Sequence, residues 1–306
     1  MIFSFDNLIE IKGGLSKKKV YRKYEKKISK IVLDFSNESN EYKNFLKVYD
    51  ILKKLNISIP KIYEVYPKKK IIVMEDFGKK SFDKILEEED LYNLLKLAVE
   101  NLIIIQNSIM CDDLLKLKKY THEDLKSEIS EFVDFYIPYK KISNFASADF
   151  YKTWVKAYKN QKFDFSSFSH KDYEFINLIL LSNKSLHLKC GIIDFQSAFV
   201  GFVGWDLFSI LENPRLNLTR DYNEDLIKYF YENVNVKSKF DSFRNQYYLL
   251  NLSRLTRLLG RWIKLLNEGN KEFIKFVEPT QKRIIFCLQN IQDRKLKKIY
   301  EEIFIN

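Results

Sequence analysis

The sequence predicts an α+β protein with two lobes, a small antiparallel-sheet lobe followed by a large and mainly helical one. Segments rich in β-branched and aromatic residues fill the first eighty or so positions, and a helical period prevails from Ser81 onward. One short pair of apolar strands interrupts the helices within residues 168–200. With 306 residues, of which 46% are hydrophobic, the chain can bury a sizeable core. We expect lobes at 1–78 and 79–306.

The first lobe is expected to hold strands around one helix. The expected strands cover residues 9–12, 20–24, 30–35, 60–66 and 70–74, where β-branched and aromatic residues are frequent. Apolar residues recur with a helical period over 40–55. Glu75-Asp76-Phe77-Gly78 follows the last strand, and its polar, turn-prone character predicts a hinge.

The second lobe is expected to be helical apart from its central strand pair. The expected helices cover 81–87, 90–109, 122–136, 148–160, 222–234, 238–267, 270–292 and 293–304. The two apolar strands, 178–181 and 188–194, frame a hairpin at 182–185.

Composition excludes several classes of protein. Three widely spaced cysteines predict neither a disulfide framework nor a zinc site. No apolar stretch is long enough to cross a bilayer, and the first residues lack the pattern of a signal peptide, so we expect a cytoplasmic protein without membrane association. The net charge of +11 raises the question of nucleic-acid binding, but its lysines are spread over the whole chain. We expect no nucleic-acid partner and infer no obligate protein partner.

The segment that carries the chemistry is His170 to Asn177, followed by Gly191-Ile192-Ile193-Asp194-Phe195. Phosphoryl transfer needs a carboxylate near the attacking hydroxyl and oxygen ligands that hold Mg²⁺ against the phosphates. Asp172 and Asn177, five residues apart, supply both from one loop. Asp194 ends the next hairpin and adds a second hard oxygen ligand. We therefore predict Asp172 as the catalytic residue, with Asn177 and Asp194 as Mg²⁺ ligands.

The same residues carry a family resemblance. The pattern His-x-Asp-x4-Asn, then Ile-Asp-Phe, resembles the loops of aminoglycoside phosphotransferases and choline kinases, and it is closer still to the bacterial anomeric kinases of N-acetylmuramate and N-acetylglucosamine. The chain departs from the latter pattern at Lys171, Ser197 and Trp205. The resemblance implies a protein-kinase-like two-lobe fold that uses ATP and Mg²⁺. It also implies that His170 orients the catalytic loop and that Asp206 braces it.

Further parts of the chain are similar to the family outside these two motifs. Residues 117–128 and 132–136 resemble a segment that helps to shape the sugar site, which makes Glu128 and Asp134 candidate substrate contacts. The helix 251–264 resembles a basic late helix and makes Arg254 a third candidate. Glu128 and Asp134 are equally compatible with solvated helix positions, and Arg254 with one positively charged helix face.

The first lobe is expected to hold the nucleotide. Gly13-Gly14-Leu15-Ser16 resembles the family's phosphate-covering turn, in which glycines let backbone N–H groups approach phosphate oxygens. Lys30 is the candidate for a strand lysine that anchors the phosphates, although its sequence context differs from that of protein kinases. Glu75 and Phe77 lie in the predicted hinge, whose backbone is expected to bind the adenine edge.

The expected function is ATP-dependent phosphorylation of a hydroxyl on a small molecule. By resemblance, the first-choice acceptor is the anomeric hydroxyl of an N-acetylated amino sugar. The same scaffold accepts aminoglycosides, choline and homoserine, so an antibiotic or small-alcohol kinase is the alternative within this class. An alternative of another class is a pseudokinase-like module that binds nucleotide without transferring phosphate. The positive net charge disfavours a cationic drug as the acceptor.

Overall fold

A computed structural model describes residues 7–11, 18–25, 28–216 and 219–305. The chain packs into two compact units. The first unit consists of residues 1–117 together with 170–198, and the second consists of 118–169 together with 199–306. This packing division differs from the predicted lobe boundary at 78/79, because the segment with the central strand pair packs with the first unit. The lobe boundary stays a prediction about which parts hold nucleotide and substrate.

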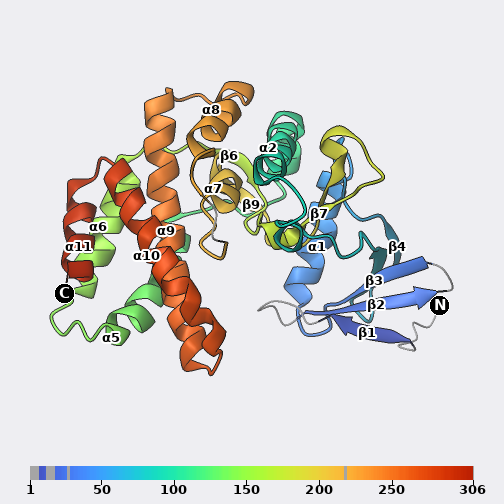
Figure 1. Ribbon diagram of the computed structural model, residues 1–306, viewed down its shortest axis with the longest axis horizontal. Helices are drawn as coiled ribbons and strands as arrows, with labels where there is room; N and C mark the ends of the chain where they lie inside the picture. Colours follow the sequence, from blue (N-terminus) through green and yellow to red (C-terminus); the bar gives the residue numbers. More distant parts are fainter. Residues whose placement is uncertain (1–6, 12–17, 26–27, 217–218, 306) are drawn as a thin grey trace. The chain divides into compact units, whose positions relative to one another are not determined.

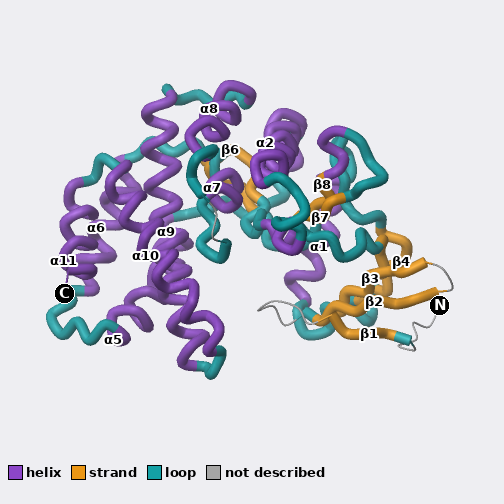
Figure 2. Tube along the Cα trace, viewed as in Figure 1, coloured by secondary structure: helices purple, strands orange, loops and turns teal. Residues whose placement is uncertain are grey.

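The first unit is built on a five-stranded antiparallel sheet (Figures 1 and 2). Its strand order is β1-β2-β3-β5-β4. The strands are β1 (Leu8–Ile11), β2 (Lys19–Glu25), β3 (Ile28–Asp34), β4 (Ile62–Tyr66) and β5 (Ile71–Glu75). All five strands expected in this part of the sequence therefore form, each within a few residues of its predicted bounds. β5 is the most buried of them, and it pairs with β3 on one side and β4 on the other.

Helix α1 (Ser39–Leu52) packs both against the end of β3 and against the segment around Phe195. Its apolar face buries Phe45, and the Phe45 ring lies 5.7 Å from the ring of Phe35, just after β3. Phe45 also stacks on Phe195 at a centroid distance of 4.7 Å. Because Phe195 directly follows Asp194, this aromatic row fixes the region of the predicted metal ligand against the sheet.

The rest of the first unit supports the central hairpin. Its elements are a 3-10 turn (Phe82–Lys84), α2 (Leu91–Ser108), α3 (Cys111–Leu114), a 3-10 turn (Phe175–Asn177), β7 (Leu178–Leu180), a 3-10 turn (Leu186–Lys189) and β8 (Cys190–Ile192). The buried amide of Asn101 in α2 donates to the His187 carbonyl at 2.9 Å. Ser58 and Lys80 accept backbone hydrogen bonds from Ile192 and Leu180, each at 2.8 Å, so residues far apart in the sequence hold the hairpin.

The second unit is helical around one two-stranded sheet (Figures 1 and 2). Its helices are α4 (His122–Glu131), α5 (Ile137–Tyr139), α6 (Ser147–Asn160), α7 (Trp205–Leu211), α8 (Asn223–Asn233), α9 (Phe240–Asn267), α10 (Val277–Asn290) and α11 (Arg294–Ile305), with a π-helical turn (Phe132–Tyr136) and a 3-10 turn (Lys271–Phe276). The sheet pairs β6 (Phe165–Ser169) with β9 (Phe199–Phe202). Helix α9 is buried on nearly every side, which makes it the centre of this unit.

Gly260 sets how closely α9 approaches its neighbours. A Cβ atom at this position would lie 2.2 Å from the carbonyl carbon of Glu131, at the junction between α4 and the π-helical turn. The neighbouring Arg261 holds the Glu131 carboxylate with Nε at 2.7 Å and Nη2 at 2.6 Å. The contact between α9 and Glu131 thus depends both on a glycine and on a bidentate ion pair.

Three local predictions need correction. The predicted helix 81–87 is a single turn at Phe82–Lys84, because the backbone around Ser81 bridges to Ile179 of β7. The predicted helix 270–292 begins with a 3-10 turn before α10. Strands β6 and β9 were not predicted separately. Among the described residues, no helix combines the length and apolar character that a membrane span requires.

Candidate functional site

The predicted catalytic loop runs from His170, directly after β6, to Asn177. Asn177 holds this loop closed, because its Nδ2 donates to the backbone carbonyl of Asp172 at 2.8 Å. Its backbone N–H donates to Glu174 at 2.8 Å. Lys171 has a φ of 78°, a left-handed conformation that is uncommon for a residue with a side chain. The turn therefore places Asp172 and Asn177 next to each other by a specific backbone conformation.

The predicted metal loop follows β8 and is tied to the catalytic loop at Ile193. The Ile193 N–H donates to the carbonyl of Asn177 at 3.1 Å, and the Ile193 carbonyl lies 3.1 Å from Nε2 of His170. Asp194 comes next, with a φ of 67°. Both backbone polar groups of Ile193 are thus held by the catalytic loop. The three residues that the sequence singled out, Asp172, Asn177 and Asp194, lie on two loops that are hydrogen-bonded to each other.

His170 is a buried positioning residue in this arrangement. Its side chain is inside the protein, and burial lowers the pKa of the imidazole to about 4. The ring is therefore neutral at pH 7, and because a carbonyl oxygen only accepts, the proton on Nε2 points to Ile193. Tyr173 anchors the same loop from the other side by donating to the Ala98 carbonyl of α2 at 2.9 Å.

Asp194 forms an ion pair with Lys18, the residue that precedes β2. The Asp194 side chain is 34% exposed, whereas the Lys18 side chain is 8% exposed. Burial raises the pKa of the Asp194 carboxyl, but the charge and the hydrogen bond of Lys18 outweigh burial, so that the pKa lies below its usual range. Asp194 is therefore ionised at neutral pH, as a metal ligand must be.

The donor set fits Mg²⁺. Nδ2 of Asn177 is used within the loop, which leaves Oδ1 as the amide atom that could bind a cation. Asp194 adds an ionised carboxylate, and both are hard oxygen donors of the type that Mg²⁺ prefers. Within the described part of the chain, no cluster of three or more histidine, cysteine, aspartate or glutamate side chains could hold a metal by itself. Mg²⁺ usually takes one or two protein carboxylates and completes its shell with phosphates and water.

The predicted hinge is fixed by its own side chains. Asp76 accepts from Arg22 of β2 through Nε at 2.5 Å and Nη2 at 3.0 Å, and it also accepts from the Gly78 N–H at 2.8 Å. Burial raises the pKa of the Asp76 carboxyl, but these hydrogen bonds and the charge of Arg22 lower it below its usual value. Glu75 exchanges backbone and side-chain hydrogen bonds with Lys61. The backbone from Glu75 to Gly78 is thus held in one shape.

Phe77 explains why a glycine follows Cys190 in β8. A Cβ atom on Gly191 would lie 2.6 Å from Cδ2 of the Phe77 ring. The predicted hinge residue therefore packs on the strand that leads to Asp194. This contact links the two predicted nucleotide-facing segments of the first unit.

The remaining residues predicted to contact the nucleotide are Lys30 and the turn with Gly13, Gly14 and Ser16. Lys30 lies over the ring of Tyr63, with Nζ 5.6 Å from the ring centroid. Its strand position is opposite Lys23 and Glu75, so it lies on the other face of the sheet from Arg22. This placement does not support the phosphate contact expected of Lys30. Gly13, Gly14 and Ser16 lie outside the described residues.

The sequence prediction gave neither Lys18 nor the side chain of Arg22 a role of its own. Both contact a carboxylate of the candidate site, Asp194 for Lys18 and Asp76 for Arg22. The signal that could have found them is their spacing. They are four residues apart, and an extended backbone that continued the predicted strand 20–24 back to Lys18 would put both on one face.

The predicted substrate residues all lie in the second unit. Glu128 accepts from the hydroxyl of the buried Tyr120 at 3.0 Å. Asp134 is exposed in the π-helical turn, a type of irregularity that is frequent at functional sites. Arg254 is 1% exposed inside α9, which supports neither direct substrate contact nor a solvated positive face. Asp206 is buried in the first turn of α7, and its bracing role stays a prediction.

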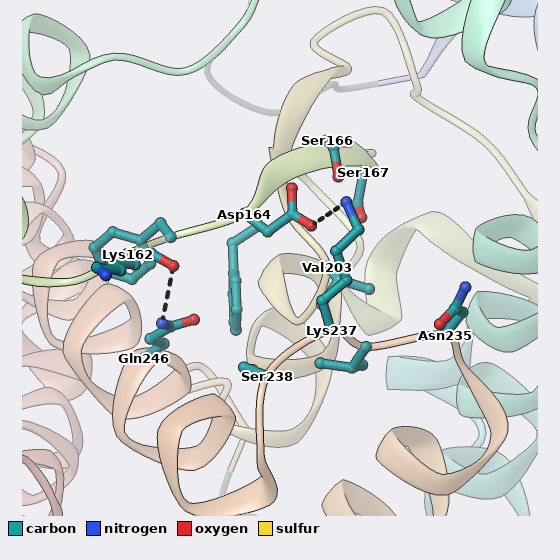
Figure 3. Close-up of a pocket in the computed structure, with 12 residues that line it drawn as sticks. Lys162, Asp164, Ser166, Ser167, Val203, Asn235, Lys237, Ser238 and Gln246 are labelled. Atoms are coloured by element: carbon teal, nitrogen blue, oxygen red, sulfur yellow. Dashed lines mark hydrogen bonds and ion pairs between the residues drawn. The ribbon is translucent and has the colours of Figure 1, made fainter.

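A pocket of about 450 Å³ opens beside β6 in the second unit (Figure 3). Hydroxyl and amide groups, among them Ser166, Ser167 and Asn235, line it. The carboxylate of Asp164 in its wall is paired with Lys237 at 3.0 Å, and Gln246 donates to the Lys162 carbonyl at 3.4 Å. Apolar side chains, among them Phe163 and Val236, complete the lining, and no catalytic role follows from it.

The fold and the two coupled loops define a kinase-like phosphotransferase architecture, and solved structures with the same fold are phosphotransferases and choline kinases. A spectinomycin phosphotransferase, solved with ADP and spectinomycin, has a TM-score of 0.58 and 14% identity, with 92% of each chain covered. A choline kinase from Streptococcus pneumoniae has a TM-score of 0.60 and 12% identity, covering 92% of this chain and 94% of its own. These likenesses confirm the predicted fold class.

Residues 7–233 match the phosphotransferase enzyme family, and the chain belongs to that family. A relative within reach of direct sequence comparison is an N-acetylmuramate/N-acetylglucosamine kinase from Caulobacter vibrioides, which is 24% identical. The match covers 72% of this chain and 63% of that relative. The family resemblance predicted from the two central motifs is confirmed.

Proposed function

We propose that this protein transfers the terminal phosphoryl group of ATP to a hydroxyl of a small molecule. The observation that carries the proposal is the pair of hydrogen bonds made by the backbone of Ile193, one to Asn177 and one to His170. They join the loop of Asp172 and Asn177 to the loop of Asp194. Phosphoryl transfer depends on positioning and on stabilisation of charge, and both need such a fixed arrangement. Membership of the phosphotransferase enzyme family supports the same reaction class.

In this proposal each loop has one task. Asp172 orients the acceptor hydroxyl and accepts its proton as the oxygen attacks the γ-phosphorus in line. Asn177 and Asp194 hold Mg²⁺, which supplies positive charge to the phosphate oxygens when it is bound. His170 keeps the two loops together without changing its charge. The backbone from Glu75 to Phe77 receives the adenine edge, and we place the activity in the cytoplasm, where ATP is available.

The acceptor that we propose is the anomeric hydroxyl of an N-acetylated amino sugar. Its support is the relative from Caulobacter vibrioides together with the run Asp194-Phe195-Gln196-Ser197-Ala198 in the metal loop. The net charge of +11 agrees better with a neutral or anionic acceptor than with a polycation. Glu128 and Asp134 remain the proposed acceptor contacts in the second unit.

A panel of acceptors tests this proposal. Purified protein with Mg-ATP is incubated separately with N-acetylglucosamine, N-acetylmuramate, glucose, choline and kanamycin, and ADP release is measured together with the mass of the product. We expect the N-acetylated sugars to give a monophosphate without a reducing end, because the anomeric hydroxyl is consumed. A phosphorylated aminoglycoside would replace the proposed acceptor, while Mg-ATP binding without transfer to any acceptor would favour a nucleotide-binding module.

A further inference from the structure

The two faces of β2 carry different basic residues. Side chains alternate along a strand, so Lys18 and Arg22 point to one face and Lys19 and Lys23 to the other. On the first face, both basic groups meet a carboxylate. Lys18 pairs with Asp194 of the metal loop, and Arg22 pairs with Asp76 of the hinge. This face of β2 is therefore turned toward the loops that we propose as the nucleotide site.

The surroundings of Lys18 hold its charge in a defined place. Its side chain is 8% exposed, and Nζ lies 5.9 Å from the centroid of the Phe35 ring. Phe35 belongs to the aromatic row with Phe45 and Phe195, which fixes the chain on the far side of Asp194. Lysine and aspartate are thus both supported by the same packing. The exposed third of the Asp194 side chain is the part that remains open to a ligand.

The register of the sheet separates Lys30 from this arrangement. Lys30 pairs directly with Lys23 on β2 and with Glu75 on β5, and directly paired residues share a face. Lys23 is one residue from Arg22, so its face is the opposite one. Lys30 could reach the face of Lys18 only if β3 shifted by one residue. Such a shift would move Val32 to the other face of the sheet and away from its packing partners Ile71 and Val73, which the sheet core opposes.

We propose that Lys18, directly before β2, is the cation that binds the phosphate groups of the nucleotide beside Asp194, in the role that the sequence suggested for Lys30. This inference rests on the proposed function. Without nucleotide, Lys18 neutralises Asp194. With nucleotide bound, its ammonium group bridges the Asp194 carboxylate and a phosphate oxygen, since an ammonium group has three N–H donors. The phosphate-anchoring charge thus comes from the residue directly before β2, whereas protein kinases use a lysine of the third strand.

Nucleotide affinity, measured by calorimetry without any acceptor, tests the inference. Lys18→Met keeps the aliphatic stem on Phe35 and removes the charge. We expect it to weaken ADP binding about ten- to a hundred-fold, the size typical of a hydrogen bond between charged groups, both with Mg²⁺ and with EDTA. Lys18→Arg should retain part of the affinity. Lys19→Met is the matched control, because it removes the same charge from the opposite face of the same strand.

The variant Asp194→Asn distinguishes the contribution of Lys18 to ADP affinity from that of Mg²⁺. We expect this variant to bind ADP in EDTA at least as tightly as the wild type, because the competing carboxylate charge is gone, and to gain less affinity from Mg²⁺ than the wild type, because an amide oxygen carries no charge. Circular dichroism of each variant checks the fold. Should Lys18→Met not fold, the Lys18→Arg protein and the Lys30→Met protein still decide the question.

Two results would overturn the inference, and they differ from failure of the proposed function. Unchanged ADP affinity in folded Lys18→Met would exclude the phosphate contact. Weakened affinity in Lys30→Met, with Lys18→Met like the wild type, would return the role to Lys30. If the wild-type protein itself binds neither ADP nor ATP, the proposed function fails before the lysines are compared.

Discussion

Asn177 lies between the two loops of the candidate site and serves both through different atoms. Its Nδ2 holds the carbonyl of Asp172, its backbone carbonyl holds Ile193, and Oδ1 is the proposed metal ligand. Removing the side chain should therefore affect the fold and the metal together, whereas changing only the amide nitrogen should affect the fold alone.

We expect Asn177→Ala to lower the free energy of unfolding by about 1 kcal/mol, the net value of one hydrogen bond, and to abolish the effect of Mg²⁺ on ADP affinity. Asn177→Asp should show the same loss of stability in EDTA but keep the effect of Mg²⁺, because it retains an oxygen ligand. Urea unfolding and calorimetry measure the two quantities. Wild-type behaviour of Asn177→Ala in both would remove Asn177 from the site.

His170 makes stability depend on pH in a predictable direction. Its folded pKa is about 4, below the unfolded value of 6.5. Below pH 6.5 the unfolded chain takes up a proton that the folded protein refuses, so stability falls as the pH drops from 6.5 to 4. The total loss is roughly 3 kcal/mol, at about 1.4 kcal/mol for each pKa unit.

His170→Gln provides the comparison, since its amide nitrogen can still donate to Ile193 but does not titrate. Urea unfolding of both proteins between pH 4 and 7.5 separates the contribution of His170 from that of the carboxylates, which both proteins share. We expect the wild-type curve to fall more steeply. Parallel curves would show that His170 is accessible to protons in the folded state.

At the residue scale, the sequence predicted those site residues that can be recognised from their spacing within a short segment. Asp172, Asn177 and Asp194 belong to two short segments, and their residue types alone indicate the chemistry. Lys18 was missed because its partner is 176 positions away. The face on which a strand residue lies can be derived from alternation, but the loop that covers that face follows only from tertiary packing.

At the scale of elements, the contact between α9 and α4 offers a test of close packing. Alanine favours a helix over glycine by about 1 kcal/mol, so Gly260→Ala would stabilise an open position. At Gly260 the added Cβ meets backbone atoms of Glu131 and Phe132, which cannot rotate away. We expect the steric effect to win and the free energy of unfolding to fall by about 1–3 kcal/mol or more.

Urea unfolding measures this loss, and Asn267→Ala, at an exposed position of the same helix, is the control that should change little. A Gly260→Ala protein as stable as the wild type would mean that α9 and α4 are not in close contact.

Elements with a clear period were predictable, and those that depend on distant partners were not. Helix α9 agrees with its predicted bounds because apolar residues occur along its whole length. Strand β6 has the short sequence Phe-Ser-Ser-Phe-Ser and pairs with β9, more than thirty residues further along. Neither strand has a local signal that distinguishes it from the loops beside it, so only the pairing reveals them.

At the scale of the whole molecule, the chain leaves the first unit, builds part of the second and then returns. Residues 170–198 carry the candidate catalytic and metal loops, and they pack with the sheet and α2. Sequence order placed them in the helical lobe because helices precede and follow them. The hydrogen bonds to Ser58, Lys80 and Ala98 that attach them to the first unit join residues 75 or more positions apart, a distance that periodicity does not cover.

The central claim is that Asp172 performs the proton transfer while the rest of the site holds the nucleotide. Comparing Asp172→Asn with the wild type, using the acceptor found in the panel, tests it most directly. We predict that kcat falls at least about a hundred-fold, as expected on loss of a general base, while the Kd for Mg-ADP stays nearly the same. Retention of wild-type kcat, or an equal loss of kcat and nucleotide affinity, would contradict this account.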